Sequence, residues 1–184
     1  MSLRNTDAEF GSVARFFHWA MAILIIGSLA LIEIADAAPR GSDLRVALRD
    51  WHAQAGLVVL ALVWMRLAWR VTGTVPRIVP SPPAWQLAAS HAVEWTFYGL
   101  MIALPILGIA MMQADGKTVS LLGFTLPAVV AVDKAWAHGV EDVHEWLGNA
   151  MMVLIGVHVA ATLFHSIALR DNTLARMFRR RGQG

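Results

Sequence analysis

The sequence of 184 residues contains no cysteine, and only 15% of its residues are charged. Without cysteine the chain cannot form a disulfide framework, ligate an iron–sulfur cluster or bind haem covalently through thioethers. The shortage of charge excludes an ordinary soluble domain, in which about a quarter of the residues are charged. We also set a nucleic-acid partner aside, because the arginines lie beside apolar runs, where membrane topology explains them.

Apolar residues make up 57% of the sequence and gather in four long runs. The runs cover residues 16–34, 52–71, 92–112 and 147–169. Each has the roughly 20 residues with which a helix crosses a hydrocarbon core about 30 Å thick. A fifth run, residues 119–132, is shorter and broken by Gly123 and Pro127, which predicts a re-entrant or surface segment. We therefore expect an all-α membrane protein, a four-helix transmembrane bundle running up-down-up-down.

The chain is expected to form a single transmembrane domain over residues 10–180. Residues 1–9 and 181–184 are predicted to be short flexible tails. The residues before the first run include Asp7 and Glu9 and lack a small-residue cleavage site, so we expect the first span to stay in the mature protein.

Positive charge is distributed unevenly between the two sides of the expected bundle. With both termini on one side, that side holds ten of the fifteen lysines and arginines: Arg4, Arg15, Arg66, Arg70, Arg77, Arg170, Arg176, Arg179, Arg180 and Arg181. The other side holds Arg40, Arg45, Arg49, Lys117 and Lys134. Because cytoplasmic loops are enriched in these residues, we expect both termini on the cytoplasmic side of the membrane. The arginine run at residues 179–181 is also expected to contact anionic lipid headgroups.

Seven histidines are the most informative polar residues. Six of them lie in or at the ends of the expected spans, where an ionisable side chain is costly and marks a functional site by default. They are His18, His52, His91, His144, His158 and His165. The seventh, His138, lies in an outer connector and is interpreted as a surface histidine.

The spacing of these histidines predicts two binding sites at different depths. His144 and His158 are 14 residues apart, so they share one face of a helix and lie about 21 Å apart along its axis. Two neutral imidazoles from facing helices can hold a b-type haem from both sides. Antiparallel threading pairs His52 with His144 and His18 with His158. His165 is the alternative to His158, but it would place the irons about 31 Å apart, the full thickness of the core.

Two glycines stand beside the outer pair of histidines. Gly56 and Gly148 follow His52 and His144 by four residues each, and therefore lie on the same helix faces. They would give a flat macrocycle room to approach the backbone. The alternative is that they tighten helix packing, as small residues do in membranes.

Other polar residues lie near the inner ends of the spans. For Arg66 and Arg70 two interpretations stay open: they snorkel to the headgroups, or they pair with haem propionates. Glu94, near the same ends of the spans, could simply neutralise one of the two. His165 and His91 could hydrogen-bond a quinone carbonyl and deliver protons, because histidine titrates near neutrality. We therefore place an inner quinone site at His165, with His91 as its second candidate.

Several short motifs, in order along the chain, carry a family resemblance. They are Phe17, His18 and Trp19; Trp51, His52 and Gly56; Met65, Arg66 and Leu67; Ile102, Ala103, Leu104 and Pro105; His144 and Glu145; Gly156, Val157 and His158; and Asp171, Asn172, Thr173 and Leu174. With them, residues 10–180 resemble the bacterial cytochrome b561 family, which is related to the cytochrome b subunits of nickel–iron hydrogenases.

The resemblance implies a four-span membrane cytochrome with two b-type haems. It implies His18, His52, His144 and His158 as the axial ligands, in agreement with the spacing. It also implies electron transfer to or from ubiquinone, and some members resemble superoxide oxidases, which oxidise superoxide outside and pass the electron to ubiquinone. Whether this chain is itself an enzyme of that kind stays open at this point.

The charge of the outer side bears on superoxide as a substrate. An anion is steered by a positive mouth. The five outer cations are opposed by Glu33, Asp36, Asp43, Asp50, Asp115, Asp133, Glu141 and Asp142, which makes the outer side net negative. A local patch of Arg40, Arg45 and Arg49 could still focus a positive field.

Two alternatives to a superoxide-oxidising cytochrome follow from the same residues. The first is a membrane subunit that passes electrons between quinone and a peripheral dehydrogenase, hydrogenase or soluble cytochrome, and an acidic outer face suits a basic partner. The second, from another class, is a haem-free metal or proton transporter that uses the histidines as ligands or relays. It lacks carboxylates deep in the spans.

Overall fold

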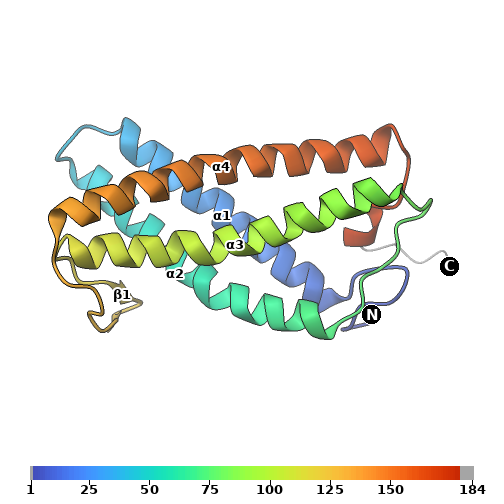
Figure 1. The fold of residues 1–184 in the computed structure, drawn as a ribbon, viewed down its shortest axis with the longest axis horizontal. Helices are drawn as coiled ribbons and strands as arrows, with labels where there is room; N and C mark the ends of the chain where they lie inside the picture. Colours follow the sequence, from blue (N-terminus) through green and yellow to red (C-terminus); the bar gives the residue numbers. More distant parts are fainter. Residues whose placement is uncertain (1, 179–184) are drawn as a thin grey trace.

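The computed structural model describes residues 2–178, which form four long helices, a two-stranded hairpin and a short 3-10 helix (Figure 1). In chain order the elements are α1 (Ser12–Ala37), α2 (Asp43–Thr72), α3 (Ala84–Ala114), β1 (Ser120–Leu121), β2 (Phe124–Thr125), α4 (Lys134–Ile167) and η1 (Ala175–Met177). Each of α1 to α4 is long and apolar enough to cross a membrane. The predicted all-α transmembrane bundle is confirmed. The arginine run at 179–181 and the tail predicted at 181–184 lie outside the described residues.

Successive helices run antiparallel, with α1 packed on α2, α2 on α3 and α3 on α4 (Figure 1). The backbone N–H of Phe10 donates to the carbonyl oxygen of Arg176, 3.3 Å away, so the residues before α1 and after α4 meet at one end of the bundle. We call this the terminal end; it contains the starts of α1 and α3 and the ends of α2 and α4. The opposite end, which carries the hairpin, is the loop end.

Each long helix begins before the apolar run that predicts it. The turns added to α2 and α4 contain most of the charged residues of these helices, and both are capped by side chains. Ser42 Oγ accepts a hydrogen bond from the N–H of Arg45 (3.2 Å), and Asp133 Oδ1 accepts one from the N–H of Trp136 (3.0 Å). Such caps satisfy N–H groups that have no partner within the helix, so α2 and α4 extend beyond the hydrocarbon core.

The buried core lies in the middle of the bundle and is almost entirely apolar. Its buried members are Met21, Val59, Val63, Tyr98, Leu100, Met101 and Met151, contributed by all four membrane helices. Most other large apolar side chains point outward, including Ile23 and Val153. Because lipid is as apolar as these side chains, the outward faces need no protein cover.

The segment predicted as re-entrant or surface is a surface segment. Residues 119–132 contain the antiparallel strands β1 and β2, with Leu121 paired to Phe124, at the loop end (Figure 1). Gln54 holds the hairpin: its Nε2 donates to the carbonyl oxygen of Ser120 (2.6 Å) and its Oε1 accepts from the N–H of Leu122 (3.1 Å). In the same way Gln113 holds the backbone of residues 127–130. The strands were not predicted from the sequence.

The amino-terminal residues are attached to the connector between α2 and α3. The sequence predicts a flexible tail over residues 1–9, whereas in the structure Asn5 Nδ2 donates to the carbonyl oxygen of Thr74 (2.7 Å) and its Oδ1 accepts from the N–H of Gly11 (2.9 Å). The carbonyl oxygen of Asp7 accepts from the N–H of Arg77 (2.8 Å). These bonds close the terminal end of the bundle.

Candidate functional site

Two pairs of histidines face each other inside the bundle, one toward each end. At the loop end His52 of α2 and His144 of α4 have ring centroids 6.2 Å apart. Toward the terminal end His18 of α1 and His158 of α4 have centroids 6.4 Å apart. These are the pairs that depth counting along the spans predicts. The structure does not place His165 in the terminal-end pair.

The spacing of both pairs suits a metal held between them. A metal–imidazole bond is about 2 Å long, so two imidazoles that bind one metal from opposite sides have ring centroids roughly 6 Å apart. Both observed separations, 6.2 Å and 6.4 Å, fit this requirement.

The second nitrogens of the loop-end histidines support the same interpretation. His52 Nδ1 lies 2.9 Å from the carbonyl oxygen of the buried Ser28. A carbonyl oxygen can only accept, so Nδ1 carries the proton and Nε2 is left as a free ligand, the usual arrangement of a metal-binding histidine. His144 Nδ1 is buried and makes no hydrogen bond to any residue between 2 and 178, which is costly for an isolated imidazole.

Open space beside the histidines suits a flat macrocycle. A Cβ atom added at Gly56 or at Gly148 would meet nothing within 4 Å, so these glycines do not serve close helix packing. His158 is exposed although it faces His18 and the ring of Phe97, whose centroid is 5.5 Å away. Over the described residues, α4 is not among the helices that pack closely on α1 or α2, the helices that carry its partner histidines. The residues present therefore fit a haem at each pair.

The two pairs are separated along the bundle by apolar packing. The 14 residues between His144 and His158 correspond to about 21 Å along α4. The buried core, including Val63 and Met151, fills the intervening depth. A pair of sites at these positions would lie one above the other across the membrane.

Two arginines predicted near the inner sites have different surroundings. Arg70 donates to Glu94 through Nε (2.6 Å) and Nη2 (3.0 Å), which neutralises its charge. Arg66 Nε donates to the hydroxyl oxygen of Tyr98 (3.3 Å), and among the described residues no carboxylate lies within 4.0 Å of it. Arg66 follows His52 by 14 residues on α2, as His158 follows His144 on α4, so Arg66 lies at the depth of the terminal-end pair. Of the two arginines, Arg66 is therefore better placed to pair with an anionic group at the terminal-end site.

The ion pair of Arg70 and Glu94 is expected to stabilise the fold. Replacing Arg70 by methionine leaves the carboxylate unpaired, and because the two side chains are 22% and 31% exposed we expect a loss of about 1–2 kcal/mol, less than for a fully buried pair. For a chain of this size the melting temperature in detergent then falls by roughly 3–6 °C. Arg77→Met, at an exposed position of the same end, is the matched control. A melting temperature of R70M equal to that of the unmodified protein would contradict this role.

His165, predicted to serve a quinone, is bound to a residue that the sequence did not single out for this role. His165 Nδ1 lies 2.6 Å from Asp171 Oδ2, and Asp171 Oδ1 accepts from the N–H of Thr173 (2.8 Å). Burial raises the pKa of the Asp171 carboxyl, but its hydrogen bonds with His165 and Thr173 outweigh this, and its pKa lies below the ordinary value. The carboxylate is therefore ionised at neutral pH and fixes the orientation of the imidazole.

The next residue attaches this turn to the connector. Asn172 Oδ1 accepts from the N–H of Val79 (2.8 Å), and the N–H of Asn172 donates to the carbonyl oxygen of Val79 (3.1 Å). Residues 171–174, one of the motifs that carry the family resemblance, directly precede η1. His91 is exposed on α3, and no hydrogen bond joins it to His165 in the described part of the chain.

At the loop end one carboxylate offsets part of the charge of the predicted positive patch. Asp36 Oδ1 accepts from Arg45 Nη2 and from Arg49 Nη2, each at 2.9 Å. Arg45 also donates to the carbonyl oxygen of Ala35 (2.9 Å), where α1 ends. Arg40 makes no ion pair with residues 2–178. His138 is exposed, 3.7 Å from Glu141, as expected of a surface histidine.

No group of three or more histidine, aspartate or glutamate side chains gathers as a metal site within residues 2–178. The histidines come together in twos. Structural and catalytic zinc sites use four or three protein ligands, whereas a haem iron needs only two axial ones. This grouping favours haem over a simple metal ion.

A helical membrane bundle that presents two internal histidine pairs, with room beside them, defines a class of protein: a membrane cytochrome of b type. Comparison with protein families agrees, since the model of the family described as prokaryotic cytochrome b561 matches residues 9–180. The chain belongs to this family. It is a multi-pass bacterial membrane protein that binds b-type haem and serves electron transfer.

Individual relatives cover most of the chain. Cytochrome b561 homolog 1 of Escherichia coli (strain K12) is 35% identical over 173 residues, 94% of this chain and 98% of the relative. The probable superoxide oxidase CybB of Yersinia pestis is 32% identical over 160 residues, 87% and 90% of the two chains. Cytochrome b561 homolog 2 of Escherichia coli (strain K12) is 30% identical over 178 residues, 96% and 95% of the two chains.

Proposed function

We propose that this protein holds two b-type haems and carries electrons across the bacterial inner membrane, between a reactant at the loop end and ubiquinone at the terminal end. The observation that carries this proposal is the presence of two histidine pairs at different depths of one bundle. A single pair could not connect the two surfaces. The arginine bias of the sequence supports an orientation with the terminal end in the cytoplasm.

In this proposal the histidine pairs hold the haems and the neighbouring side chains tune them. His52 and His144 are the axial ligands toward the loop end, and His18 and His158 those toward the terminal end. When bound, each haem supplies reversible one-electron transfer at its iron. Ser28 fixes the tautomer of His52, and Arg66 places a positive charge beside the terminal-end pair, where it can neutralise a propionate. Arg70 is already paired with Glu94 and contributes less.

The quinone site is proposed around His165, two helical turns beyond His158 and nearer the terminal end. Reduction of one ubiquinone to ubiquinol consumes two electrons and two protons, so the site needs a group that delivers protons. His165 suits this role because the ionised Asp171 holds its Nδ1 and leaves Nε2 for a quinone carbonyl. His91 has no such support and remains the second candidate.

Replacing His165 by asparagine tests the quinone site. We expect quinone reduction to slow by at least about tenfold, because general acid catalysis is lost, while the absorption bands of both haems stay unchanged. The measurement is steady-state quinone reduction beside haem spectra of the same sample. His138→Asn, at an exposed position outside the proposed site, is the control and keeps full turnover. Unaltered turnover of H165N would remove this residue from the site.

For the reactant at the loop end, the similarity to the probable superoxide oxidase of Yersinia pestis supports superoxide. Each superoxide would give up one electron and leave as dioxygen, and two such electrons with two protons would convert one ubiquinone to ubiquinol. The protein would then act as a superoxide:ubiquinone oxidoreductase.

A second candidate reactant is a redox protein, from a soluble cytochrome to a peripheral dehydrogenase or hydrogenase. The pairing of Arg45 and Arg49 with Asp36 favours it, because it weakens the positive field that would attract superoxide. Mixing the oxidised protein separately with superoxide, ubiquinol and a reduced basic cytochrome distinguishes these reactants. Superoxide is supported if it reduces both haems fastest, and the redox-protein candidate is supported if the cytochrome does.

A further inference from the structure

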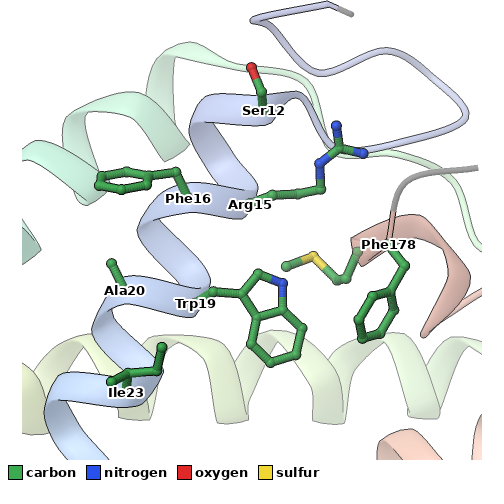
Figure 2. Close-up of a pocket in the computed structure, with 8 residues that line it drawn as sticks. Ser12, Arg15, Phe16, Trp19, Ala20, Ile23 and Phe178 are labelled. Atoms are coloured by element: carbon green, nitrogen blue, oxygen red, sulfur yellow. The ribbon is translucent and has the colours of Figure 1, made fainter.

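A shallow hollow lies on the outer side of α1 at the terminal end, separate from both histidine pairs. It has a volume of about 590 Å³. It is lined by Ser12, Arg15, Phe16, Trp19, Ala20, Ile23, Met177 and Phe178. Figure 2 shows Arg15, Trp19 and Phe178 on one side of α1, with Ile23 one turn beyond Trp19. The hollow is therefore polar where α1 begins and apolar toward the middle of the membrane.

Arg15 is the charged group of the hollow, and the protein does not satisfy it. Its Nη1 is buried and makes no hydrogen bond within residues 2–178. Glu9 has the nearest carboxylate oxygen, at 4.0 Å from Nη1, which is too long for a hydrogen bond. A buried guanidinium nitrogen without an acceptor is costly, so an anionic group from outside the chain would be bound favourably here.

The surroundings of Arg15 add to its positive potential. The first turn of α1 contains no acidic residue, and no side chain caps the helix. The N–H of Ser12 donates to the carbonyl oxygen of Ser2 (3.1 Å), and the positive end of the helix dipole lies beside Arg15. An anion at the mouth of the hollow would thus be attracted by charge and by the helix dipole together.

The rest of the lining is apolar and faces lipid. Phe16 is 66% exposed and Ile23 is 71% exposed, on a helix that crosses the membrane. Trp19, whose ring centroid lies 5.4 Å from that of Phe178, comes between Arg15 and Ile23 along α1, at the depth where tryptophan marks the membrane interface (Figure 2). An occupant must therefore combine an anionic head at Arg15 with an apolar chain along α1.

We propose that this hollow binds one anionic phospholipid, with its phosphate at Arg15 and an acyl chain along Phe16, Ala20 and Ile23. Charge complementarity selects this occupant. Ubiquinone would fill the apolar part, but it carries no charge to match the guanidinium. A second copy of the chain would have to bring a carboxylate to the same depth of the membrane.

The test is binding of two lipids that differ only in their headgroups. The protein purified in mild detergent is titrated with dioleoylphosphatidylglycerol and with dioleoylphosphatidylcholine, and bound lipid is counted by native mass spectrometry. Both lipids carry a phosphate, but the choline ammonium of phosphatidylcholine cancels its charge and is repelled by Arg15. We therefore expect one phosphatidylglycerol to bind about tenfold more tightly than phosphatidylcholine, roughly the value of one charge-assisted contact. Arg15→Gln abolishes this preference. Arg77→Gln, at an exposed arginine of the same end outside the hollow, retains it.

A second variant keeps Arg15 and fills the hollow instead. Ile23→Trp, at an exposed position, is expected to reduce phosphatidylglycerol binding while the haem spectra stay unchanged. The proposal is overturned if the unmodified protein binds both lipids equally, or if Arg15→Gln keeps the preference. Displacement of bound phosphatidylglycerol by a short-chain quinone would assign the hollow to quinone and would overturn it as well.

Discussion

Replacing His144 by alanine is expected to remove one of two six-coordinate haem centres. The residue faces His52 across the loop-end site, its ring nitrogen Nδ1 has no partner in the described part of the protein, and alanine offers the iron no ligand. The terminal-end pair lies about 21 Å away along α4 and is expected to keep its haem. The haem content and the fraction of low-spin iron per chain measure this result. Electron transfer from a loop-end donor to quinone is expected to fall to background.

The matched control for this variant lies on the same helix. His138 is an exposed histidine one and a half turns before His144, so His138→Ala removes an imidazole from α4 without touching either site. We expect it to retain both centres. If H144A also kept two six-coordinate haems, the ligand assignment at the loop end would be wrong.

Filling the space beside His144 is expected to have the same effect as removing the ligand. Gly148 lies one turn after His144, and a Cβ atom there would meet nothing within 4 Å. Leucine at this position would leave the helix intact, because leucine favours a helix over glycine by up to about 1 kcal/mol. Its side chain would instead occupy the space proposed for the macrocycle. We therefore expect Gly148→Leu to bind one haem where the unmodified protein binds two.

A second glycine of α4 serves as the control. Gly139 also has nothing within 4 Å of an added Cβ atom, but it lies five residues before His144 and on a different face of the helix. Gly139→Leu is expected to keep both haems. Circular dichroism shows whether either variant alters the helix content. Two haems in a well-folded Gly148→Leu protein would mean that no macrocycle uses this space.

The bundle and the histidine pairing were predictable from the sequence for a simple reason. Membrane spans are fixed by local apolar length, and the rise of a helix converts residue number into depth. Depth paired His52 with His144, and the shorter distance between the two irons favoured His158 over His165 as the partner of His18. The same counting also explains why His165 could not be rejected firmly, because it shares nearly the same face of the helix as His158.

What could not be predicted depends on the rotation of one element against another. Arg70 and Glu94 are 24 residues apart, and the sequence offered Glu94 as a partner for one of two arginines without indicating that the partner is Arg70. Gln54 holds a hairpin 66 residues away through its side-chain amide, and no periodicity indicates such a partner. The hydrogen bond between Asp171 and His165 could not be predicted, because an aspartate near a helix end is also common as a residue that bonds only to the local backbone.

The charge of the loop end bears on which electron donor reacts there, superoxide or a redox protein. Counting charges along the sequence left a positive patch of Arg40, Arg45 and Arg49 open. The structure assigns Arg45 to the end of α1 and gives Arg45 and Arg49 one shared partner, Asp36. A weak positive field suits a protein partner at least as well as superoxide, so the nature of the donor is decided by reaction with each in turn.

The central claim is that four histidines hold two haems in the pairs seen in the structure, and double variants test it most directly. The measurement is the number of six-coordinate, low-spin haem centres per chain, counted by electron paramagnetic resonance. Removing both members of one pair, His52→Ala with His144→Ala, is predicted to leave one centre. Removing one member from each pair, His18→Ala with His144→Ala, is predicted to leave none. Equal counts in the two double variants, or two centres in either, would contradict the account.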